Sequence, residues 1–151
     1  MIARRFFSVL VIGLALGAPA EALDLSLPAA ARMTAASQSP LDSHSMAVTP
    51  WEDGRLELVI TEGSVSRQAW VLPATSLTTL QILEPLRTQL EAEGYVILFE
   101  CADVACGGFD FRYALPLLPE PDMHVDLGDY RYLAAERPGD PVTERLSLVV
   151  S

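Results

Sequence analysis

The sequence contains no lysine and no asparagine among its 151 residues. The absence of asparagine removes every acceptor for N-linked glycosylation. Basic side chains are scarce as well, because ten arginines stand against twenty aspartates and glutamates and leave a net charge of −10. An acidic surface repels phosphate backbones and anionic lipid headgroups, so we expect no nucleic-acid partner.

Several signatures of chemistry are also missing. The sequence has no glycine-rich phosphate loop, no G-x-S-x-G nucleophile elbow and no EF-hand pattern. It therefore predicts no catalytic residue, no cofactor and no metal centre, and we interpret the protein as non-enzymatic.

The first 22 residues have the pattern of a cleaved signal peptide. Arg4 and Arg5 form a positive start, residues 6–16 are almost all apolar, and residues 18–22 hold two overlapping A-x-A cleavage patterns. The apolar run is shorter than the roughly 20 residues that cross a bilayer; a retained N-terminal anchor is the alternative. No cysteine is close enough to the cleavage site to carry a lipid anchor. We predict export to the periplasm and a mature domain that does not span a membrane.

The mature chain divides into two parts. Residues 23–50 are rich in alanine, serine and proline and predict a flexible or extended arm, in which His44 is expected to be exposed. Residues 51–151 predict one small α+β domain, with a four- to five-stranded mixed or antiparallel sheet, one main helix packed on one face and a single disulfide. The expected strands are 55–60, 65–72, 95–101, 130–136 and 145–150, and residues 109–118 are ambiguous between a loop and a short helix.

The main helix is predicted over residues 77–93. Thr75 or Ser76 can cap its start, and Gly94 suits its end. Pro85 leaves two alternatives open, a single kinked helix or a helix that begins at Pro85. The strand that follows, 95–101, is nearly all apolar and is expected to be central in the sheet, reached by a right-handed crossover.

Cys101 and Cys106 are the only cysteines. In an oxidising compartment a pair of cysteines becomes a disulfide, and four intervening residues allow the sulfurs to meet, so we predict a structural staple. A redox-active pair is an alternative, although the spacing is not C-x-x-C and no Lys, Arg or His within the loop would lower a thiol pKa. A metal site is a further alternative, for which two cysteines supply too few ligands.

His124 lies in a short run of acidic residues that includes Asp126, with Asp129 close behind. A histidine among carboxylates can bind a metal or a small ligand, or transfer protons. The same segment is a proline-bounded loop in which polar residues simply face solvent. These three residues are therefore weak binding candidates.

Several stretches together resemble one family. They are 68–70, 78–81, 86–90, 94–101, 106–112 and 123–133, and the order of GY, C, CG and YLAA ends at Tyr132–Ala135. This pattern resembles the N-terminal, uncharacterised domain of OmpA-like envelope proteins of alphaproteobacteria, and a related bacterial domain of unknown function.

The resemblance implies an envelope location, a non-enzymatic role, and other envelope proteins or the cell wall as partners. In that family a C-terminal domain typically follows and binds peptidoglycan through an Asp and an Arg. Those positions would lie beyond residue 151, and we expect either a free-standing module or a fragment of a longer protein.

Overall fold

A computed structural model of the chain describes residues 23–151. The predicted signal peptide lies outside the described residues. Within residues 23–151 no helix is long and apolar enough to cross a membrane.

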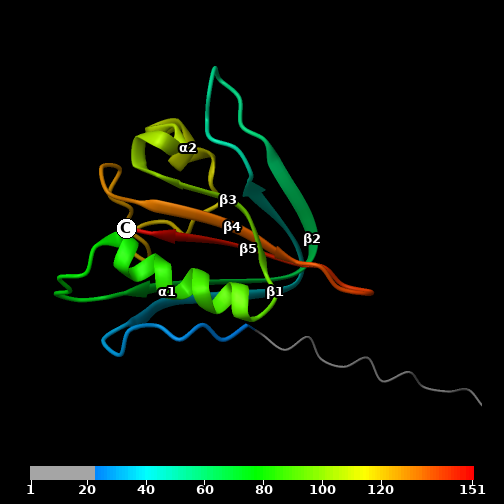
Figure 1. Ribbon diagram of the computed structural model, residues 1–151, viewed down its shortest axis with the longest axis horizontal. Helices are drawn as coiled ribbons and strands as arrows, with labels where there is room; N and C mark the ends of the chain where they lie inside the picture. Colours follow the sequence, from blue (N-terminus) through cyan, green and yellow to red (C-terminus); the bar gives the residue numbers. More distant parts are fainter. Residues whose placement is uncertain (1–22) are drawn as a thin grey trace, which may run out of the picture.

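Five strands form two separate sheets. Strands β1 (Arg32–Ala47) and β2 (Leu58–Val71) form a long antiparallel hairpin. Strands β3 (Val96–Ala102), β4 (Arg131–Arg137) and β5 (Glu144–Val150) form an antiparallel sheet in the order β3–β4–β5 (Figure 1).

Within residues 23–151, helical structure is limited to three short elements. The longest is α1 (Thr79–Ala92). A 3₁₀ turn, η1 (Asp103–Cys106), follows β3 and leads into the seven-residue helix α2 (Gly108–Ala114).

The predicted single sheet with one main helix is wrong. Strands dominate the structure, and β2 and β3 belong to different sheets, so no crossover joins parallel strands. The expected central strand, β3, lies at an edge, and β4 is central. The physical reason is the composition of β4, whose alternate residues are buried on both of its faces, Tyr132 and Ala134 on one and Leu133 and Ala135 on the other.

The predicted flexible arm is also wrong for residues 32–47, which form strand β1. These residues are mostly alanine, serine and other small or polar types, so they lack the apolar alternation that identifies a strand. Their extended conformation comes from pairing with β2. The register shifts between Ser39 and Asp42, where Pro40 sits, because a proline cannot donate to the ladder.

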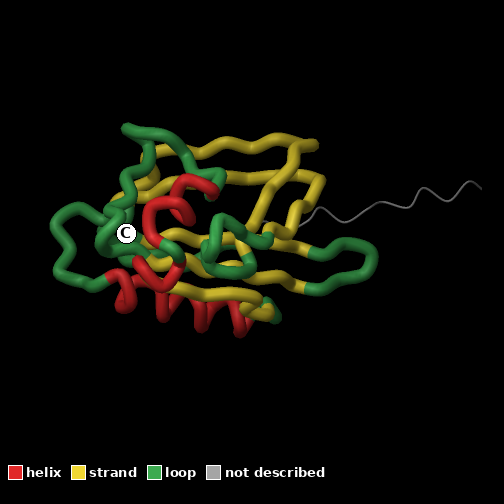
Figure 2. Tube along the Cα trace, turned by 90° about the horizontal axis from the view of Figure 1, so that it is seen from above, coloured by secondary structure: helices red, strands yellow, loops and turns green. Residues whose placement is uncertain are grey.

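Two hydrophobic cores lie on opposite faces of the three-stranded sheet. Figure 2 shows α1 along one side of this sheet and the β1–β2 hairpin toward the other. The helix-side core contains Leu83, Leu90, Tyr95, Leu133, Ala135 and Val150. The hairpin-side core contains Met46, Ala47, Cys106, Phe111, Leu115, Val125, Tyr130, Tyr132 and Ala134.

Helix α1 is continuous through Pro85, which lies on its exposed side. The N-cap is Thr78, not Thr75 or Ser76, and it forms a capping box with Gln81. Gly94 follows the helix with a φ of 84°, the left-handed conformation that favours glycine at this place.

Candidate functional site

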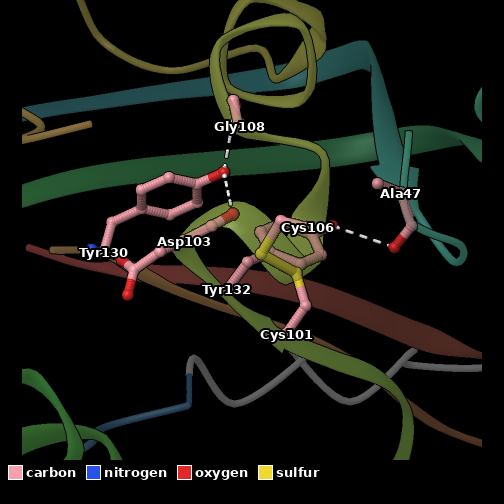
Figure 3. The surroundings of a disulfide bond; sticks show 7 residues. All are labelled: Ala47, Cys101, Asp103, Cys106, Gly108, Tyr130 and Tyr132. Carbon is pink, nitrogen blue, oxygen red and sulfur yellow. Dashed lines mark hydrogen bonds between the residues drawn. A yellow bond between two sulfur atoms is a disulfide. The ribbon is translucent and has the colours of Figure 1, made fainter. Parts of the chain in front are cut away.

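The predicted disulfide is present. Cys101 lies in β3 and Cys106 ends η1, with the sulfurs 2.07 Å apart and the Cα atoms 5.2 Å apart (Figure 3). Cys106 is completely buried in the hairpin-side core, whereas Cys101 is partly buried. The link therefore ties the end of an edge strand to the start of α2 inside the core.

The turn after Cys106 brings the tip of the hairpin against the disulfide loop. Gly107 has a φ of 107°, and a Cβ atom there would lie 2.5 Å from both the Cβ and the carbonyl oxygen of Trp51. The Trp51 amide donates to the carbonyl of Cys106 over 2.8 Å. Only a glycine allows this approach, so the first glycine of the Cys-Gly-Gly stretch has a steric reason in the contact with Trp51.

Tyr130 and Asp103 hold the disulfide loop by several hydrogen bonds. The Tyr130 hydroxyl lies 3.1 Å from the carbonyl of Gly108 and 3.3 Å from that of Asp103 (Figure 3). The Asp103 carboxylate accepts the Tyr130 amide, and the Asp103 amide donates to the Tyr130 carbonyl over 3.0 Å. Burial and the nearby Asp103 carboxylate raise the pKa of Tyr130, so the phenol stays protonated and able to donate.

Tyr132 joins the disulfide region to the hairpin. Its hydroxyl donates to the carbonyl of Ala47 in β1 over 3.1 Å (Figure 3). Burial raises the pKa of Tyr132 to about 12. Its ring meets those of Phe99 and Phe111 at centroid distances of 6.1 and 5.1 Å, within the range of favourable aromatic pairs.

The arrangement around the sulfurs suits a permanent cross-link. Thiol–disulfide exchange requires a thiolate to reach one of the sulfurs. Cys106 is covered by aromatic side chains and by the hairpin tip, so attack there would require the core to open. This burial protects the Cys106 sulfur, whereas Cys101 in β3 is only partly buried.

The weak binding candidates have separate partners. His124 is exposed, and its Nδ1 lies 2.6 Å from the Glu120 carboxylate. Asp126 accepts the Gly128 amide within its own turn, and Asp129 accepts the hydroxyl of Thr79 over 2.8 Å. Across residues 23–151 no group of three or more His, Cys, Asp or Glu side chains is arranged to hold a metal ion.

An open hollow of about 750 Å³ lies beside the junction of the hairpin tip and α2. Its lining includes Trp51, Glu52, Arg55, Glu57 and Ala114. It therefore presents an indole and charges of both signs to solvent. Nearly all of its lining comes from the hairpin tip, residues 49–58, and Ala114 of α2 closes one side.

Sequence reasoning also missed His44. The expected exposed arm residue is half-buried, and its Nε2 lies 3.1 Å from the hydroxyl of Ser147 in β5. The only available signal was its place between serines, which does not distinguish an arm from a strand.

Neither a scan against protein-family models nor a search of curated proteins finds a match to this chain. The OmpA-like resemblance therefore stays a prediction.

Proposed function

We propose that the protein is an exported, non-enzymatic module of the bacterial cell envelope, in which the Cys101–Cys106 disulfide is a permanent structural staple. The observation that carries this proposal is the burial of Cys106 within the hairpin-side core. Disulfides persist in oxidising compartments and are rare in the cytosol. The signal-peptide pattern of residues 1–22 supplies the route to such a compartment.

The proposed role is binding or scaffolding at the outer membrane or cell wall. The OmpA-like resemblance supports these partners, and the net charge of −10 disfavours nucleic acids. The hollow beside Trp51 offers a place on the module for a partner to contact.

The first experiment tests export and the state of the thiols together. The full chain is produced in a Gram-negative host, the periplasm is separated from the cytosol, and the N-terminus is sequenced. We expect periplasmic protein that begins near residue 23 and that reacts with an alkylating reagent only after denaturation and reduction. Intact precursor in the cytosol, with both cysteines alkylated under native conditions, would overturn the proposal.

The second experiment separates a staple from a redox enzyme. Replacing both cysteines by serine removes a cross-link between positions separated by five, and we expect a loss of about 2 kcal/mol in the free energy of unfolding. Val104→Ala is the matched control, because Val104 lies in the same loop and is 87% exposed. A reduction potential near that of glutathione, instead of one far below it, would favour the redox enzyme.

A further inference from the structure

A polar seam connects the hairpin to the three-stranded sheet. We define the polar seam as His44 and Thr61, which are cross-strand partners in the hairpin, together with Arg145 and Ser147 on β5. The His44 Nε2 lies 3.1 Å from the Ser147 hydroxyl, and Arg145 donates to the Thr61 hydroxyl over 3.1 Å. These two contacts join β5 to both strands of the hairpin.

The surroundings of His44 favour the neutral form of its imidazole. Its Nδ1 is buried and, among the residues that the structure describes, has no hydrogen-bond partner. A neutral imidazole can leave this nitrogen as an unprotonated acceptor, whereas a charged imidazolium carries a proton on both nitrogens. Protonation would therefore bury an N–H without an acceptor, which costs free energy.

Among the described residues 23–151, the carboxylates nearest His44 in the hairpin and in the three-stranded sheet are already paired with arginines. On the hairpin, Asp42 is paired with Arg67 at 3.0 Å. On the three-stranded sheet, Glu136 is paired with Arg145 at 3.1 Å. Glu62 is the next acidic residue on β2 and lies on the exposed side of the hairpin.

The titration of His44 follows from this setting. Burial lowers the pKa of His44 from its ordinary value of 6.5, and the positive charge of Arg67 lowers it further. A depressed pKa means that the closed seam binds the proton less readily than the open one. The free energy that favours the closed seam is complete above about pH 6.5 and decreases as the pH falls toward the lowered pKa.

We propose that His44 is a pH-dependent latch that holds the hairpin to β5 while its imidazole is neutral and releases the polar seam when it is protonated. The release is local. The hairpin remains anchored just beyond His44 on β1, where Met46 and Ala47 are buried in the hairpin-side core and Ala47 accepts the bond from Tyr132. Acid therefore breaks the two contacts of the polar seam without unfolding the domain.

The test uses proton NMR of the oxidised mature protein between pH 8 and pH 4. The sequence has two histidines, so the His44 signals are assigned by comparison with the His44→Gln variant. We expect the His44 midpoint to lie below the ordinary histidine value of 6.5. The cross-peaks between Thr61 and Arg145 should weaken at the same midpoint, to about a tenth of their intensity one pH unit below it.

Two variants provide the controls. In His44→Gln, which cannot take up a proton, the Thr61–Arg145 cross-peaks should persist across the whole range. In His124→Gln they should be lost as in the unsubstituted protein. Cross-peaks that survive protonation of His44, or that disappear equally in His44→Gln, would overturn the latch. If His44→Gln does not fold, the unsubstituted protein still decides the question: the midpoint of the His44 titration either coincides with the midpoint of the cross-peak loss or does not.

Discussion

Replacing Gly107 by alanine is the sharpest test of the packing around the disulfide. Gly107 has a φ of 107°, and the added Cβ would lie 2.5 Å from two atoms of Trp51. One methyl group therefore meets two obstacles, a backbone conformation that disfavours side chains and a neighbour whose backbone is fixed by its bond to Cys106. The adjacent Gly108 meets only the first, since its φ is 62° and a Cβ there has nothing within 4 Å.

The two obstacles can be given separate magnitudes. A side chain in a sparsely populated backbone region costs about 1–3 kcal/mol. Forcing an extra carbon into a packed site costs about 1–3 kcal/mol more. We expect Gly107→Ala to lower the free energy of unfolding by about 4 kcal/mol. Gly108→Ala should lower it by about 1–2 kcal/mol, the cost of the left-handed conformation alone.

Urea denaturation followed by circular dichroism measures both variants under identical oxidising conditions. The slope of free energy against urea should remain the same, because the surface exposed on unfolding does not change. If Gly107→Ala is too unstable for a full curve, its thermal midpoint is compared with that of Gly108→Ala. Equal losses for the two variants would refute the argument that Trp51 requires a glycine at position 107.

Three further substitutions follow from the contacts described above. Tyr132→Phe should cost about 1 kcal/mol of stability, because it leaves the buried carbonyl of Ala47 without its donor; an unchanged urea midpoint would contradict this. Glu144→Gln should reduce the loss of unfolding free energy at acid pH. Arg137 holds the pKa of Glu144 below its ordinary 4.5. The carboxylate therefore stabilises the fold above pH 4.5, and this contribution is lost as the pH falls through the lowered pKa. A titration of stability between pH 6 and pH 2 checks this, and identical profiles would refute it. Thr78→Ala should cost about 1 kcal/mol by removing the capping box of α1, and a thermal midpoint unaffected by the change would show that the cap contributes little.

Local patterns predicted the elements that carry their own hydrophobic signal. Leucines at helical spacing predicted α1 within two residues at its start, and Gly94 marked its end. The apolar runs at 95–101, 130–136 and 145–150 correspond to β3, β4 and β5. The disulfide could be predicted from two cysteines and an export signal, since no other pairing within the chain exists.

The pairing of the strands could not be predicted in the same way. β1 carries little apolar signal, and its conformation depends on β2, whose sequence lies beyond a ten-residue loop. β2 itself was predicted as two strands separated by a turn, yet it runs through Gly63 because that residue pairs with Asp42 beside the bulge. The central position of β4 in its sheet depends on the burial of both of its faces. A run of apolar residues in the sequence does not show whether one face or both faces are buried.

The same long-range dependence governs the position of His44. His44 is 103 positions from Ser147, its partner in β5. A histidine between serines carries no information about a strand so far along the chain. The candidate binding residues near His124 show the complementary case, because they are close in sequence but their side chains contact different partners.

The bond between Tyr132 and Ala47 spans 85 positions, and this separation sets the order of assembly. The hairpin strands β1 and β2 precede the three strands of the sheet against which the hairpin packs. The hairpin-side core cannot close until β4 has emerged, and the last strand then fixes the ribbon from the side. The hairpin-side core of this domain therefore depends on residues from both halves of the chain.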